Sequence, residues 1–72
     1  MSNTVTIELS GDEALVLFHW LAEMYGAKLD LDDAEQRVFL SIQASLERSL
    51  VEPFAKNYLE LVERARQRIL EK

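Results

Sequence analysis

The chain has 72 residues, a net charge of −5, no cysteine and an apolar fraction of 49%. This length predicts a single domain over 1–72, and the apolar fraction excludes a disordered tail. The lack of cysteine excludes disulfides and thiolate metal sites. No apolar run reaches the roughly 18 to 20 residues of a membrane-spanning helix, and the first residues lack the basic and apolar parts of a signal peptide. We therefore expect a cytoplasmic protein that does not enter the membrane.

The charges are unevenly distributed along the chain. Residues 1–35 carry eight acidic side chains against one lysine, whereas residues 36–72 carry seven basic and five acidic ones. An acidic half suits a basic partner surface, whereas duplex nucleic acid requires clustered lysines and arginines. Acidity also serves simply to keep a small protein in solution. The charge pattern disfavours nucleic acid as the main partner and leaves protein binding and solubility both open.

The first predicted element is a β-strand over 4–9. Val5, Ile7 and Leu9 alternate there with polar residues, as in a half-buried strand. A second short strand near 28–31 is one reading of a similar alternation, and an extended linker is the other. A lone strand leaves its backbone N–H and C=O groups without a ladder partner. If the second strand is absent, we expect the first to pair with another molecule.

The first predicted helix covers about 12–26 and is apolar on nearly every side, which is typical of a central helix that other elements cover. Ser10 and Glu13 stand at capping-box spacing at its start. Trp20 is expected in the core. In the alternative arrangement, Val16 and Trp20 belong to an exposed patch with an aromatic anchor.

The second predicted helix covers about 32–51 and ends before Pro53, because the residue before a proline disfavours the α region. Its expected core face is a main apolar line formed by Ala34, Val38, Ile42, Leu46 and Leu50, with Phe39 at the edge. On the opposite side runs a second apolar line formed by Leu40, Ala44 and Val51, with Glu47 between them. Such a line suits a partner helix, although singly exposed apolar residues are also ordinary on protein surfaces.

The third predicted helix covers about 54–71 and begins either at Pro53 or after Asn57, which has capping-box spacing to Glu60. It is expected to pack onto the first two helices. The elements together predict a mainly α, small α+β fold: one N-terminal strand, with or without the second, followed by three amphipathic helices.

One cluster of acidic residues precedes and begins the second helix: Asp30, Asp32, Asp33 and Glu35. A calcium loop starting at Asp30 fails, because Ala34 falls at the third ligand position and Ser41 at the twelfth. Helix capping and the helix dipole explain acidic residues at this position. We expect this acidic cluster to be a charged surface and not a metal site.

No catalytic set is present in the sequence. His19 is the only histidine, and only Glu23, one helical turn later, is placed to contact it. Glycines are too few to cradle a phosphate. The basic group at the end of the third helix is interrupted by glutamates and lacks interleaved aromatic residues; it comprises Arg64, Arg66, Arg68 and Lys72. The sequence therefore predicts neither an enzyme, nor a cofactor, nor a small-molecule substrate, and it disfavours nucleic acid.

Four segments resemble a group of short, uncharacterised bacterial proteins with a DEALVLF helix, an AEQR segment and an EPF turn. They are DEALVLFHWL at 12–21, AEQRVFL at 34–40, LERSLVEPF at 46–54 and YLELVERAR at 58–66. The resemblance covers roughly residues 7–68. It implies a bacterial, cytoplasmic protein and carries no activity, cofactor or catalytic residue.

Two functions fit these observations. The first is a small acidic module that binds another protein, for example a basic toxin or nuclease that it neutralises as an antitoxin or immunity protein does. The second is a self-assembling homodimeric structural or regulatory protein that pairs through the 4–9 strand or the second apolar line.

Overall fold

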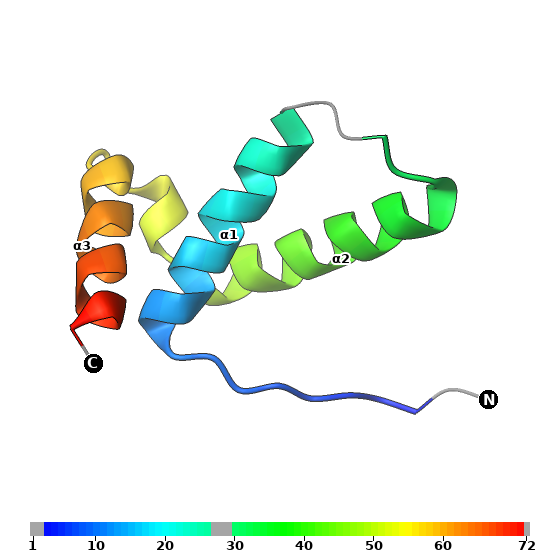
Figure 1. Ribbon diagram of the computed structural model, residues 1–72, viewed down its shortest axis with the longest axis horizontal. Helices are drawn as coiled ribbons and strands as arrows, with labels where there is room; N and C mark the ends of the chain where they lie inside the picture. The colour runs from blue at the N-terminus through cyan, green and yellow to red at the C-terminus, as the bar shows by residue number, and fades with distance from the viewer. Residues whose placement is uncertain (1–2, 27–29, 72) are drawn as a thin grey trace.

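The computed structural model describes residues 3–26 and 30–71, which form three α-helices (Figure 1). The helices are α1 (Gly11–Gly26), α2 (Asp33–Ser49) and α3 (Tyr58–Leu70), and a short 3₁₀ helix, η1 (Glu52–Phe54), precedes α3. The mainly α fold is therefore confirmed. None of the helices that the structure describes combines the length and apolar composition needed to span a lipid bilayer.

Local capping interactions fix where the first two helices begin. At α1 the backbone N–H of Ser10 donates to Glu13 Oε1 at 2.8 Å, and the backbone N–H of Glu13 donates to Ser10 Oγ at 3.1 Å. At α2 the backbone N–H of Glu35 donates to Asp32 Oδ1 at 2.7 Å, and Glu35 Oε1 accepts from the backbone N–H of Asp32 at 3.0 Å. Both pairs are capping boxes, in which side chains satisfy N–H groups that a helix leaves unpaired.

The connection between α2 and α3 is longer than predicted. The α2 helix ends at Ser49, because Leu50 turns to an extended conformation and buries its side chain in the core. Pro53 belongs to η1, and Ala55 is again extended. The α3 helix therefore begins at Tyr58, directly after Asn57, which is the second of the two predicted starts, and the earlier start near 54 is wrong. Asn57 occupies the N-cap position without a side-chain cap hydrogen bond, so the predicted capping box with Glu60 is wrong.

The core lies where α1, α3 and the end of α2 meet. Its buried side chains are Leu15, Phe18, Leu50, Val62 and Ala65. α1 contacts both of the other helices, whereas close contacts between α2 and α3 are few (Figure 1). The prediction that α3 packs onto both earlier helices is therefore met mainly for α1.

Two predicted core assignments are wrong, for the same reason. Trp20 is 55% exposed, because α2 and α3 pack against one half of α1 and Trp20 lies on the opposite half. On α2 only one edge of the main apolar line reaches the core, so Val38 and Ile42 remain substantially exposed. Phe39, which was expected at the edge, is buried and contacts the ring of Tyr25 at a centroid distance of 5.5 Å.

The predicted strand over 4–9 is absent, since the described residues contain no β-strand. Those residues form an extended stretch that leads into the start of α1 (Figure 1). Their backbone has no neighbouring strand within the described chain, and a ladder cannot form without one. The alternative second strand near 28–31 lies partly outside the described residues, and its last two positions, Asp30 and Leu31, have no regular structure.

Candidate functional site

The most distinctive surface feature is the N-terminal segment, residues 3–9. It lies beside α1 and α2, yet its side chains remain largely in solvent, with Val5 84% and Ile7 71% exposed. Apolar side chains thus alternate along an extended segment. This segment forms no β-ladder with any other described part of the chain. An extended segment of this kind presents unpaired backbone groups and one apolar face.

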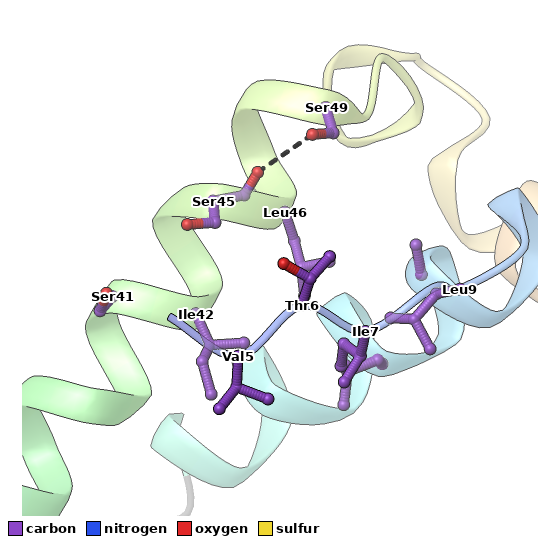
Figure 2. A pocket seen from close by; sticks show the side chains of 11 residues that line it. Val5, Thr6, Ile7, Leu9, Ser41, Ile42, Ser45, Leu46 and Ser49 are labelled. Atoms are coloured by element: carbon purple, nitrogen blue, oxygen red, sulfur yellow. Dashed lines mark hydrogen bonds between the residues drawn. The ribbon is translucent and has the colours of Figure 1, made fainter. Parts of the chain in front are cut away.

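This segment forms one wall of an open groove of about 530 Å³, here called the N-terminal groove (Figure 2). Ala14 and Leu17 of α1 and Ile42 and Leu46 of α2 also line this groove. The complete lining is Val5, Thr6, Ile7, Leu9, Ala14, Leu17, Ser41, Ile42, Ser45, Leu46 and Ser49. None of the described residues that line this groove is charged, so the groove presents methyl groups and hydroxyls.

Three serines spaced one turn apart, Ser41, Ser45 and Ser49, follow the α2 side of the groove (Figure 2). The Ser49 hydroxyl donates to the backbone carbonyl of Ser45 at 3.3 Å, and Arg48 donates to the Ser45 hydroxyl at 3.4 Å. Short side chains here leave room for another extended backbone to approach the helix.

The predicted interface residues of α2 are all exposed. Leu40, Ala44 and Glu47 lie on α2 outside its core face, and Val51 lies beyond the end of the helix, directly before η1. Leu40 is 45% exposed. The groove and the second apolar line occupy different sides of α2, separated by the core face that carries Phe39 and Leu50.

The predicted interface residues of α1 are separated from those of α2. Val16 lines a hollow of about 250 Å³ together with Arg66, Ile69 and Leu70 of α3. Trp20, one turn further along α1, is exposed. Val16 therefore lies next to α3. Trp20 is the exposed aromatic side chain on this side of α1.

The acidic cluster is exposed around the start of α2. Asp32 and Glu35 are engaged in the capping box described above, while Asp30 and Asp33 lie at the surface beside them. Within the described residues, no group of three or more His, Cys, Asp or Glu side chains is placed to hold a metal ion. The cluster contributes negative charge to one end of α2, next to the positive end of the helix dipole.

A polar contact between α1 and α3 could not be predicted from the sequence. His19 Nδ1 lies 2.9 Å from the Tyr58 hydroxyl, and the two rings meet edge to face at a centroid distance of 5.4 Å. Glu23 lies 3.6 Å from His19 Nε2, as the one-turn spacing predicted. Burial and then the Glu23 charge raise the pKa of Tyr58, which keeps its hydroxyl protonated. These contacts join α1 to α3 through the side chains of Glu23, His19 and Tyr58.

Tyr58→Phe should lower the free energy of unfolding by about 1 kcal/mol at pH 7, because one helix-joining hydrogen bond is lost. The pKa of Tyr58 is higher in the folded than in the unfolded state. The neutral hydroxyl therefore contributes fully to stability below pH 10, and this contribution is lost as the pH rises through the folded-state pKa. The difference in the free energy of unfolding between the wild type and Tyr58→Phe should therefore become smaller above pH 10. Urea unfolding at fixed protein concentration, at neutral and alkaline pH, measures both effects. A difference that is unchanged or larger above pH 10 would contradict the assignment.

The arginines at the end of α3 are engaged with acidic side chains. Arg68 forms a bidentate contact with Asp12 at the start of α1, with Nη2 to Oδ1 at 2.8 Å and Nε to Oδ2 at 3.0 Å. Hydrogen bonding to Asp12, and its charge, raise the pKa of Arg68. Arg64 pairs with Glu60, and Arg66 lies 4.0 Å from Glu63. These pairings reduce the positive charge that this surface would offer to a phosphate backbone.

Comparison of the chain with family models, with curated proteins and with solved structures finds no match. The function is therefore inferred from the surfaces described above.

Proposed function

We propose that this chain is a protein-interaction module that binds through its N-terminal segment and the adjoining N-terminal groove, and that it binds without catalysing a reaction. The observation that carries the proposal is the exposed apolar face of the segment, in which the side chains of Val5 and Ile7 are mostly exposed to solvent. Apolar side chains on an extended chain with free backbone groups suit β-strand addition, in which backbone hydrogen bonds give affinity and alternate side chains give specificity.

The wider surface supports the same proposal. Large apolar side chains are exposed on every described element, including Trp20 on α1, Leu40 on α2 and Phe54 on η1. Apolar side chains that adjoin one another at a surface mark interaction sites, as Val5, Ile7 and Leu9 do along the N-terminal segment. Binding to another protein would remove this area from water.

A finer form of the proposal concerns the partner's charge. The exposed acidic cluster and the excess of acidic residues in 1–35 favour a basic protein, such as a toxin or nuclease that the module neutralises in the bacterial cytoplasm. Charge complementarity of this kind speeds association and sets orientation. A basic partner should be retained at low salt and released as the ionic strength rises.

Capture with matched variants tests the module. Val5→Lys puts a charge on the apolar face of the segment, and Thr4→Lys puts the same charge on its polar face. Wild type and Thr4→Lys should retain one protein in stoichiometric amount from the lysate of the native host, or an untagged copy of the chain itself, and Val5→Lys should lose it. Retention of nothing above background at any salt concentration, or equal retention by all three proteins, would overturn the proposal.

A further inference from the structure

We infer that the N-terminal segment binds the same segment of a second copy, the two pairing antiparallel about Ile7 so that each partner's strand covers the other's N-terminal groove. This inference rests on the proposed function and names the partner at that site. Its chemistry, geometry and expected cross-links follow from the described residues.

The surface area matches what a dimer needs. The chain exposes 5984 Å², whereas a compact protein of its 8.3 kDa mass is expected to expose about 4,600 Å². Its radius of gyration of 13.5 Å similarly exceeds the roughly 11 Å expected for this length. The excess area is larger than the roughly 800 Å² that each partner contributes to a standard interface. The single chain therefore carries enough uncovered surface for a stable dimer.

The chemistry of the groove favours a neutral amphipathic strand. Its lining contains only aliphatic, threonine and serine side chains, so a basic segment would find no countercharge there. The N-terminal segment itself alternates aliphatic residues with Thr4 and Thr6 and carries one charge, Glu8. The chain thus contains a segment with the composition that its own groove accepts.

Residue parity restricts how two such segments pair. In an antiparallel pair, directly opposite residues point to the same face, so the two opposed residue numbers must both be odd or both be even for the apolar faces to coincide. Pairing about Ile7 sets Ile7 opposite its own copy, Val5 opposite Leu9 and Thr6 opposite Glu8. All three apolar residues of each strand then contribute to one face.

Two neighbouring registers also bring the apolar faces together, but they pair the side chains less favourably. Pairing about Thr6 sets Leu9 opposite the polar Asn3 and removes it from apolar contact. Pairing about Glu8 sets two like charges directly opposite each other, which is destabilising. Pairing about Ile7 avoids both of these unfavourable contacts. The two-fold axis of the dimer is then perpendicular to the plane of the two paired strands.

Single-cysteine variants of the full chain test this register, because the natural sequence has no cysteine. Opposed residues in a strand pair have Cα separations of about 4.5 to 5.5 Å, within the range that a disulfide spans. Under mild oxidation Ile7→Cys should cross-link to a covalent dimer. Thr6→Cys and Glu8→Cys should each stay uncross-linked alone and cross-link when the two are mixed. Light scattering on a sizing column should give the wild type a dimeric mass that falls on dilution.

Each outcome discriminates. A wild type that is monomeric at every concentration overturns the inference, and if it still captures a different protein the proposed function stands. A dimeric wild type in which Ile7→Cys fails to cross-link places the interface elsewhere, for example on the second apolar line. Cross-linking of Thr6→Cys with itself overturns the register. Circular dichroism showing unchanged helix content in each variant excludes unfolding as the cause, since all three positions precede α1.

Discussion

Leu15→Ala should remove most of the free energy of unfolding and leave a substantial fraction of the protein unfolded at room temperature. Leu15 is 2% exposed and lies in the core where α1 meets α3. Truncating a buried leucine costs about 2 to 5 kcal/mol, while a domain of this size has only about 3 to 5 kcal/mol of net stability. Circular dichroism and urea titration at fixed protein concentration would show the loss of helix and of the unfolding transition.

Leu40→Ala is the matched control, because it makes the same change on α2. Leu40 is 45% exposed in the single chain, so its truncation should change the free energy of unfolding by about 0.5 kcal/mol or less. Native-like stability of Leu15→Ala would contradict the location of the core. Equal losses in the two variants would mean that Leu40 is buried by a partner in solution, as the second apolar line suggests.

Ile7→Lys should raise the dissociation constant of the dimer by at least about 100-fold. Each dimer buries two copies of this side chain, and burial of an isoleucine contributes about 1.5 to 3 kcal/mol relative to exposure. Ile7 is 71% exposed in the single chain, so the helical fold of the separated subunit should persist. Light scattering or sedimentation over a concentration series measures the dissociation constant.

Thr6→Lys provides the control for charge and size, because it places the same side chain on the polar face of the segment. In the register centred on Ile7, the new lysine stands opposite Glu8 of the second copy, where opposite charges attract. Its dissociation constant should therefore match that of the wild type or fall below it. If Ile7→Lys and Thr6→Lys both dimerise as tightly as the wild type, the N-terminal segment lies outside the interface.

The features that could be predicted from the sequence are local ones. The capping boxes depend on residues three apart, Ser10 with Glu13 and Asp32 with Glu35, and short-range hydrogen bonds of this kind do not depend on the rest of the fold. The presence of three helices followed from their apolar periodicity. The start of α3 was left between two positions, because both a proline and an asparagine precede it.

The features that could not be predicted depend on how helices meet. Periodicity predicted apolar faces on α1 and α2, but it does not say which part of each face a neighbour covers, so Trp20 and Val38 were assigned to the core wrongly. The contact between His19 and Tyr58 joins residues 39 positions apart and had no sequence signal. The strand over 4–9 was predicted from a pattern that needs a neighbour, which the described part of the single chain does not provide.

The contact between Asp12 and Arg68 has a consequence for the order in which the molecule opens. This contact connects the first turn of α1 to the last turn of α3, and the contact between His19 and Tyr58 connects the same two helices further along α1. The core contacts of α2 lie along one edge of the helix. Backbone amides of α1 and α3 should therefore exchange with solvent deuterium together and slowly, and those of α2 sooner, as a separate unit of local unfolding. Binding of a partner that covers α2 should therefore be detected most readily as slower deuterium uptake by the backbone amides of that helix.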